Sequence, residues 1–331
     1  MNKKNAEKRQ SDFKRNQTLE SLLTEVNSDL WTIEEKLLRI EKPNFPIVFI
    51  VGPHRSGSTL MMQWLANTGL FSYPTNLLSR FYQAPIIGAK LQLLLADERY
   101  NFRDELKDFN SNVDFSSENG KTKGALAPNE FWYFWRRFLP FTDLDYLPTE
   151  LLLKESDTKT MVSEFAGMID VFQKPMALKA MILNYNIDFL DQLFENAIFI
   201  HTKRDPLTNI ASALDARERQ LGSIDEWYSF KIPEYYELKK LNPYEQVAGQ
   251  IYHINKAVED GLANVAEHKK MTVQYEYFCE NPETVYESLC NKLRENSFGV
   301  SEPYSGQERF QFTRTEMNDK DILDAFNLFY Q

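Results

Sequence analysis

One loop between a short apolar run and a segment with helical spacing constrains the fold more than any other feature of this sequence. Residues 47–51 read IVFIV, a β-branched and aromatic run that is typical of a strand buried on both faces. Gly52 and Gly57 follow, and residues 59–70 then carry apolar side chains at helical spacing. In such a strand–loop–helix unit, backbone N–H groups and the positive end of the helix dipole converge on one point. The loop therefore predicts a site for a phosphate group.

The position of the cation in this loop separates it from the loops that bind nucleoside triphosphates. The two glycines match the first half of the pattern GxxxxGK[ST], but Ser58 stands where that pattern has lysine. The loop's cation comes earlier, at Arg55. A loop without the lysine is poorly equipped for γ-phosphate and magnesium chemistry. A small-molecule or nucleotide kinase with an atypical loop is therefore an alternative, and not the favoured reading.

Further apolar runs alternate with helical segments. The other predicted strands span residues 177–182, 197–202 and 271–275. Residues 190–194 belong to a helix, and Asp205 and Pro206 predict the N-cap and first turn of another helix that runs past Ala216. This order requires parallel crossovers, so the predicted fold class is α/β. We expect a mostly parallel sheet flanked by helices, with a P-loop-like phosphate-binding loop.

Composition limits the partners and the compartment. The formal net charge is −10, so an anionic ligand needs a local basic pocket, and we expect no binding to nucleic acid. Cys279 and Cys290 lack metal-ligand spacing, and their low number suits a reducing compartment. The first twenty residues do not resemble a signal peptide, and no apolar stretch approaches the ~20 residues of a membrane span. We therefore expect a cytoplasmic globular protein.

The first 45 residues differ from the remainder, which we predict to be one domain over residues 46–331. A basic and polar tip, predicted to be frayed, contains Lys3, Lys4, Lys8, Arg9, Lys14 and Arg15. An amphipathic helix follows, with a heptad stripe formed by Leu23, Val26, Leu30, Ile33, Leu37 and Ile40. Pro43 and Pro46 end it. This helix either lies across its own domain or pairs with a second subunit in a homodimer.

Two motifs resemble the sulfotransferases that use 3′-phosphoadenosine 5′-phosphosulfate (PAPS). In that family the loop after the first strand reads like RSGTT or KSGTT, and here the corresponding residues are Arg55-Ser56-Gly57-Ser58-Thr59. The family also places an arginine at a strand end and a serine eight residues later, as Arg204 and Ser212 are here. A guanidinium fork and a hydroxyl suit one phosphate dianion. The resemblance is to a soluble, bacterial-type member.

The resemblance implies roles for individual residues. The 5′-phosphosulfate would be gripped by Arg55, Ser56, Gly57, Ser58, Thr59 and Leu60. Arg204 and Ser212 would hold the 3′-phosphate. Lys179 matches a strand lysine near the sulfuryl group, and Tyr275 matches an aromatic near the adenine. Lys179 could instead be a lysine that extends to solvent at a strand end, and Tyr275 could be a packing residue.

The matches span roughly residues 46–295, and the sequence departs from the family at two places. The C-terminal Arg-Lys-Gly run of many animal members is not recognisable, although Arg309 and Arg314 could replace it. The histidine that many relatives place two residues after the strand lysine is Met181 here, and residues 74–80 contain no carboxylate. The general base is therefore not given by the resemblance.

Two residues are candidates for that base. Glu130 precedes an aromatic run, where desolvation is expected to raise its pKa. It could instead be an acid favoured by a helix N-terminus. His54, inside the loop, is the second candidate.

Of the predicted sites, the site that binds the acceptor is the one that the sequence defines least. Asn76, Ser79 and Arg80 follow the first helix, where acceptors often approach in similar proteins. The aromatic run at residues 131–138 could stack a sugar or enclose an alcohol, or it could be core. We expect in-line sulfuryl transfer from PAPS to a hydroxyl or amine of a small-molecule or glycan acceptor, without a metal. A non-catalytic nucleotide-binding or scaffold protein is the remaining alternative.

Overall fold

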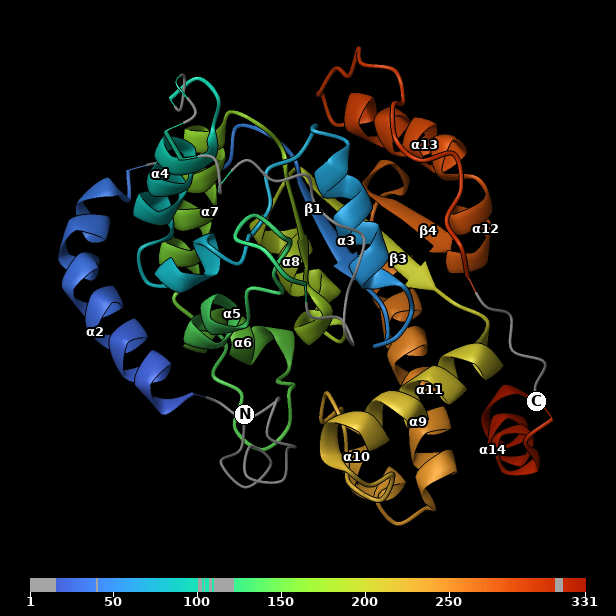
Figure 1. Ribbon diagram of the computed structural model, residues 1–331. Helices are drawn as coiled ribbons and strands as arrows, with labels where there is room; N and C mark the ends of the chain where they lie inside the picture. The colour runs from blue at the N-terminus through green and yellow to red at the C-terminus, as the bar shows by residue number, and fades with distance from the viewer. Residues whose placement is uncertain are drawn as a thin grey trace.

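The protein is built around a four-stranded parallel sheet. The computed structural model describes residues 16–39, 41–100, 122–312 and 318–331, together with Arg103, Glu105, Leu106 and Phe109. Its strands are β1 (Ile47–Val51), β2 (Met176–Lys179), β3 (Ala197–Lys203) and β4 (Lys270–Gln274), in the order β2-β1-β3-β4 (Figure 1). The predicted parallel α/β fold is therefore confirmed.

Helices cover the sheet and extend beyond its edges. In chain order the helical elements are α2 (Gln17–Glu34), η2 (Glu35–Leu37), α3 (Ser58–Asn67), η3 (Leu78–Phe81), α4 (Pro85–Ala96), α5 (Trp132–Phe138), α6 (Thr149–Glu155), α7 (Thr158–Phe172), η5 (Met181–Leu183), α8 (Ile187–Leu193), α9 (Pro206–Leu221), α10 (Tyr235–Leu238), α11 (Pro243–Ala263), η6 (Glu267–Lys269), α12 (Tyr275–Glu280), α13 (Pro282–Glu295) and α14 (Lys320–Tyr330).

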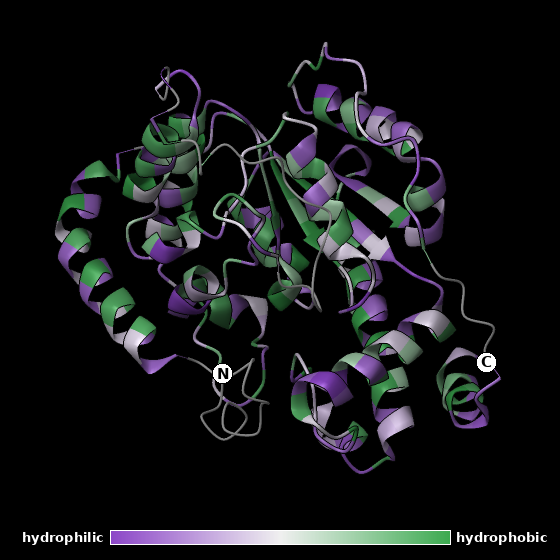
Figure 2. Cartoon of the chain, viewed as in Figure 1, coloured by the Kyte–Doolittle hydropathy of each residue, from purple (hydrophilic) through white to green (hydrophobic). Residues whose placement is uncertain are grey.

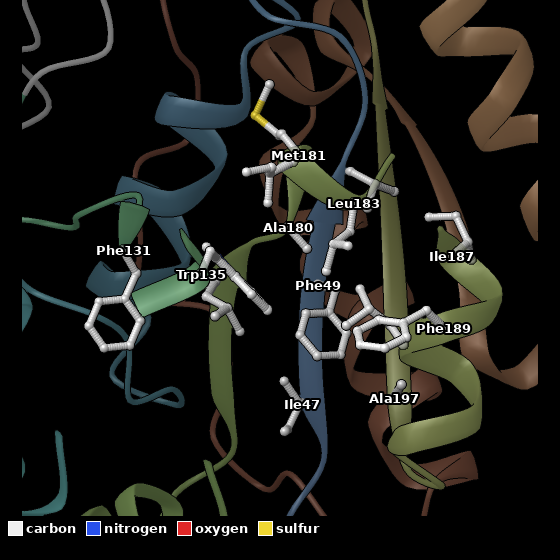
Figure 3. Close-up of a cluster of buried hydrophobic side chains, with 14 of the residues drawn as sticks. Ile47, Phe49, Phe131, Trp135, Ala180, Met181, Leu183, Ile187, Phe189 and Ala197 are labelled. Carbon is white, nitrogen blue, oxygen red and sulfur yellow. The ribbon is translucent and has the colours of Figure 1, made fainter. Parts of the chain in front are cut away.

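The central strand β1 is buried on both faces, as its apolar sequence predicts. Ile47, Phe49 and Val51 face a core formed with α5, α7 and α8, in which Figure 3 shows Phe49 and Trp135 close together. Val48 and Ile50 face the opposite core, formed with α3, α12 and α13. The central strands are accordingly hydrophobic in Figure 2, whereas α13 mixes hydrophilic and hydrophobic residues. The two cores hold the four parallel strands so that their carboxyl ends lie on the same side of the sheet.

A third, smaller core fixes α9, the helix that follows β3. Residues of α9 and α11 pack with Ile322 and Ala325 of the C-terminal helix α14. The N-terminus of α9 is closed by Asp205, whose carboxylate accepts a hydrogen bond from the Thr208 N–H at 2.9 Å, and Pro206 occupies the first turn. The predicted cap of this helix is confirmed.

Two predicted strands end earlier than expected. The strand predicted over residues 177–182 stops at Lys179, and Met181–Leu183 form a 3₁₀ turn. The chain turns there because the Asn184 side chain bonds both the N–H and the C=O of Gly52, each at 2.8 Å. The strand predicted over residues 271–275 stops at Gln274, and Tyr275 begins α12. Apolar runs predict where strands lie better than where they end.

The N-terminal helix α2 lies across its own domain (Figure 1). Buried Asn27 donates to the Arg80 carbonyl at 2.7 Å and accepts from the Gln83 N–H at 2.8 Å. Buried Glu34 accepts from the first amides of α4, Ile86 and Ile87, at 2.7 and 3.0 Å. The heptad stripe is only partly covered, since Ile33 is 53% exposed. Ile40, the basic tip and Arg314 lie outside the described residues, and pairing with a second subunit stays a prediction.

Candidate functional site

The predicted phosphate loop lies between β1 and α3 and needs glycine at both of its ends. Gly52 has φ +133°, and a Cβ there would lie 2.5 Å from the Thr202 carbonyl oxygen of β3. Gly57 has φ +91° and caps α3. The first helical amide with a partner inside the helix is that of Met61, which donates to the Gly57 oxygen at 3.0 Å. The earlier amides of the turn are therefore available to an anion.

Side chains from three separate elements hold this loop in place. The side chain of Asn184, just after η5, accepts from the Gly52 N–H and donates to the Gly52 carbonyl. The Thr202 hydroxyl of β3 contacts the Ser56 hydroxyl at 2.8 Å, and the Asn209 amide of α9 donates to the His54 carbonyl at 3.0 Å. Sequence reasoning missed all three residues. The one available signal was that Thr202 and Asn184 are polar residues close to predicted strand ends, beside the predicted phosphate site.

Two guanidinium groups lie close together at the loop, one from Arg55 within it and one from Arg204 after β3. Arg55 Nε donates to Ser212 Oγ at 3.2 Å, and Arg204 Nη1 donates to the Arg55 carbonyl at 3.1 Å. Burial, with the neighbouring cations Arg219 and Arg204, lowers the pKa of Arg55. The Nε of Arg204 is buried and has no hydrogen-bond partner among the described residues. The structure thus brings the predicted 3′-phosphate pair, Arg204 and Ser212, to the loop cation.

Tyr275 joins this cluster through Gly57. The Arg204 guanidinium lies over the Tyr275 ring, 4.9 Å from its centroid. The ring also packs so closely on the loop that a Cβ at Gly57 would lie 2.1 Å from Tyr275 Cδ2. Burial raises the pKa of Tyr275 to about 12. The Tyr275 ring, the loop and Arg204 are therefore in contact with one another at the carboxyl ends of the strands.

Lys179 ends β2 on the other side of the loop. Its side chain is only 5% exposed, and its Nζ donates to Thr59 Oγ1 at 2.8 Å and to Glu130 Oε1 at 2.9 Å. Its main-chain oxygen accepts from the Trp135 indole at 3.1 Å. The ammonium group therefore points at the first turn of α3, and the alternative of a lysine extended into solvent is excluded.

Glu130 pairs with Lys179 in the lining of a small cleft. The cleft is lined by Thr59, Met62, Thr122, Pro128, Asn129, Glu130 and Lys179. The side chain of Glu130 is 34% exposed, and its second oxygen accepts from the Trp132 indole. Although burial acts to raise the pKa of Glu130, Lys179 and the hydrogen bonds lower it below its usual value of 4.5. The expected upward shift is therefore wrong, because the ion pair outweighs desolvation.

His54, the second candidate base, lies on the side of the loop toward α9. It is 6% exposed, and its ring packs edge-on against Tyr228 with centroids 5.6 Å apart. Burial, together with Arg55 and Arg217, lowers its pKa to about 3. Its Nδ1 has no partner in the part of the chain that the structure describes. The structure therefore does not bring His54 and Glu130 together.

The residues predicted for the acceptor site mostly contact the protein itself. The Asn76 amide donates to the Gly124 carbonyl at 2.9 Å and accepts from the Asn129 amide at 2.8 Å. Ser79 donates to the Asn76 carbonyl at 2.9 Å, whereas the Arg80 side chain is exposed. Direct contact of these residues with an acceptor stays a prediction.

The aromatic run before and within α5 is largely core. Its buried members are Phe131, Phe134, Trp135 and Phe138. The two arginines that could have faced an acidic acceptor have partners in the protein, since Arg136 pairs with Asp145 at 3.2 Å and Arg137 with Glu164. The core interpretation of the run is confirmed for these four aromatic residues.

Neither a metal cluster nor a membrane-spanning helix is found in the described ranges. No group of three His, Cys, Asp or Glu side chains is close enough there to ligate one ion. None of the helices in those ranges combines the length and apolar character that a bilayer span requires.

Known proteins match this chain over most of its length. A family model described as Sulfotransferase family matches residues 46–297. Sulfotransferase STF9 from Mycobacterium avium is 13% identical, with 82% of this chain and 71% of that chain covered and a TM-score of 0.49. The sulfotransferase domain from the Synechococcus PCC 7002 olefin synthase is 19% identical, with coverages of 88% and 97% and a TM-score of 0.41. No curated protein matches the sequence.

Proposed function

Because this chain belongs to the sulfotransferase family, whose model matches residues 46–297, we propose that it transfers a sulfuryl group from PAPS to a hydroxyl or amine of a small-molecule or glycan acceptor. The observation that carries this proposal is the arrangement of three cations around one phosphate loop. Lys179 contacts the first turn of α3, while Arg55 and Arg204 lie together with Ser212. A ligand with anionic groups at two positions suits this arrangement better than one with a single phosphate chain.

We propose that the donor's two anionic ends bind at different parts of the site. Arg204 and Ser212 hold the 3′-phosphate, and the otherwise unpaired Arg204 Nε supplies a donor for it within the described residues. Residues 56–60 hold the 5′-phosphosulfate through the amides of the loop and helix start. Tyr275, whose ring packs on Arg204 and Gly57, flanks the position of the adenine.

The cations of the site stabilise the charge that builds up during transfer. As the acceptor oxygen or nitrogen forms its bond to sulfur, the bond from sulfur to the bridging oxygen breaks and negative charge develops on the departing phosphate. Lys179 and Arg55 are the donors aimed at this charge, and they require no reorganisation because both are fixed by hydrogen bonds. Fixed donors of this kind contribute about 10²–10³ in kcat each. No metal ion is needed in this scheme.

Glu130 is proposed to receive the acceptor's proton. Its pKa is held below 4.5, so the carboxylate is ionised at neutral pH and can accept a proton, although the lowered pKa makes it a weaker base than an unpaired glutamate. An acceptor group bound beside the Glu130–Lys179 pair contacts both the proton acceptor and the cation that stabilises the leaving group. His54 is the less suitable base, because its ring packs on Tyr228.

We propose that the protein acts in the cytoplasm, and the state of its two cysteines supports this location. Cys279 and Cys290 are both buried and unbonded to each other. Free, buried thiols are usual in a reducing compartment.

A ligand-binding experiment tests the proposal against both alternatives. Thermal unfolding is measured alone, with adenosine 3′,5′-bisphosphate, and with ATP and magnesium, and transfer from ³⁵S-labelled PAPS to alcohols and glycans follows. We expect stabilisation by the bisphosphate and label transfer, since ligand at 100 Kd adds about 2.7 kcal/mol. Stabilisation by ATP with magnesium alone would support a kinase, and stabilisation by neither ligand would support a scaffold.

A further inference from the structure

Glu130 belongs to a segment without regular secondary structure, yet its carboxylate lies within 2.9 Å of Lys179. A site on a loop needs supporting contacts to hold such a distance, since errors near 1 Å can cost about 10² in rate. The residues on either side of Glu130 show which contacts supply this support.

The residue after Glu130 has a strained backbone. Phe131 has φ +57° and ψ +33°, the left-handed region that bulky side chains rarely adopt, at a cost of about 1–2 kcal/mol. Its ring is 1% exposed and stacks on Phe134 with centroids 4.5 Å apart. The buried ring and the strained turn together fix the direction in which the chain leaves Glu130.

The residue before Glu130 stabilises that turn. Asn129 Oδ1 accepts from the Phe131 N–H at 2.8 Å, a side-chain turn that spans Glu130. The Asn129 amide donates to Asn76 Oδ1 at 2.8 Å, and its main-chain N–H donates to the Pro74 carbonyl at 2.7 Å. Asn129 therefore ties the backbone around Glu130 to the chain segment that follows α3.

Asn76 completes the connection. Its amide donates to the carbonyls of Thr122 and Gly124 at 3.2 and 2.9 Å, and its main-chain N–H donates to the Ala127 carbonyl at 2.9 Å. Both ends of its side chain are thus engaged with the segment that forms one wall of the cleft. A satisfied network of this kind fixes one arrangement of the backbone.

We propose that Asn129 and Asn76 are positioning residues, which hold the strained turn at Phe131 and thereby keep the Glu130 carboxylate against Lys179. The role assigned to Glu130 rests on the proposed function, whereas the positioning itself does not. The groups that face the carboxylate are Lys179 from β2 and the indole of Trp132 from α5. Loss of the Asn129 contacts lets the carboxylate move away from Lys179, and its pKa then rises.

The test compares Asn129→Ala, Asn129→Ser and Asn296→Ala. Serine retains a weaker form of the side-chain turn, so it should give partial rescue. Asn296 is the matched control, because it is buried and donates to two carbonyls, of His268 and Lys292, both at 2.9 Å. We expect Asn129→Ala to lower kcat about 10- to 100-fold, with the Kd for adenosine 3′,5′-bisphosphate within about twofold. Asn296→Ala should lower only the melting temperature.

A second readout does not depend on activity. The indole N–H of Trp132 donates to Glu130, so its NMR resonance, assigned by Trp132→Phe among the five tryptophans, follows the ionisation of Glu130. The midpoint of its pH titration should move to higher pH in Asn129→Ala, and the acid limb of kcat should move with it. An unmoved midpoint, or a kcat equal to that of Asn296→Ala, would overturn the positioning role. A moved midpoint in a protein that does not transfer sulfate would overturn the proposed function alone.

Discussion

The two walls of the candidate site are built in different ways. The donor wall consists of the loop from Gly52 to Gly57 and the starts of α3 and α9, all at strand ends of one parallel sheet. The acceptor wall is an irregular segment around Glu130, which contacts the sheet through the ion pair with Lys179 and the chain after α3 through Asn76. Parallel strands bring their carboxyl ends together whatever the loops contain, so the donor wall follows from topology. The acceptor wall depends on individual long-range hydrogen bonds.

The largest effect is expected where the two walls meet, at Lys179. Lys179→Ala removes the donor that contacts both Thr59 and Glu130, and kcat should fall by about 10²–10³ or more. Binding of adenosine 3′,5′-bisphosphate, measured by calorimetry, should change much less. Exposed Lys174, which bonds the Gly69 carbonyl, is the control. If both variants retained full turnover, the lysine would have no part in the reaction.

A side chain added at Gly57 in the donor wall should lower the stability of the protein. Gly57→Ala places a Cβ 2.1 Å from the Tyr275 ring at φ +91°, and should cost about 2–4 kcal/mol of unfolding free energy and weaken donor binding. Gly69→Ala is the matched control, since it has φ +70° but nothing within 4 Å of its added Cβ. Denaturant unfolding measures both.

The double variant Gly57→Ala/Tyr275→Ala separates the two causes of this loss. Removing the ring should recover the unfolding free energy that is lost to the clash between the Cβ added at position 57 and Tyr275. The loss caused by the positive φ at residue 57 should remain. Equal losses for Gly57→Ala and Gly69→Ala would mean that the contact with Tyr275 is unimportant.

A smaller effect is expected at Arg204 and Ser212, the pair proposed to bind the 3′-phosphate. Arg204→Ala should weaken binding of adenosine 3′,5′-bisphosphate by about 2 kcal/mol, roughly 30-fold, because a charge-assisted contact is lost. Arg204→Lys should recover only part of this, since an ammonium group lacks the planar fork. Removing the exposed Arg99, which pairs with Asp97, should leave the affinity unchanged. The comparison with adenosine 5′-phosphate is informative, because a loss for that ligand of the same size would place the arginine elsewhere on the nucleotide.

The effect expected to be smallest near neutral pH is a pH dependence of stability caused by His54. Its pKa is lowered from 6.5 to about 3 in the folded protein, so between these values the unfolded chain binds the extra proton. Stability should therefore fall as pH drops below 6.5, by about 1.4 kcal/mol per pH unit, and should be unaffected by His54 above that value. His54→Asn should flatten this slope in urea unfolding, although His201, whose pKa is lowered to about 4, retains its share. The exposed His268 serves as control, and an identical slope in His54→Asn would contradict the assignment.

The sequence predicts the arrangement of the residues in the donor wall well, because the information that it uses is local. The run at residues 47–51, the two glycines and the spacing from Arg204 to Ser212 each lie within a short stretch, and the parallel sheet brings them together. The residues that hold the loop from other elements were missed, because Asn209 belongs to no local pattern and Asn184 is marked only as a polar residue close to a predicted strand end. Their role appears only when the strands are placed side by side.

The acceptor wall shows why local patterns can also mislead. The aromatic neighbours of Glu130 are visible in the sequence and predict a raised pKa, but Lys179, 49 residues away, reverses the shift. In α2 the heptad stripe predicts an apolar contact, whereas polar Asn27 and Glu34 make the buried hydrogen bonds and Ile33 remains exposed. Hydrophobic periodicity cannot identify buried polar contacts, since these depend on which backbone groups lie opposite.

A crystal structure with adenosine 3′,5′-bisphosphate would test the central claim most directly. We predict that the 3′-phosphate lies within hydrogen-bonding distance, about 2.7–3.2 Å, of Arg204 and Ser212. The 5′-phosphate should contact the amides of residues 56–60, with Lys179 facing the position of the sulfuryl group. A 3′-phosphate that contacts neither Arg204 nor Ser212, or a nucleotide bound away from the loop, would contradict the account.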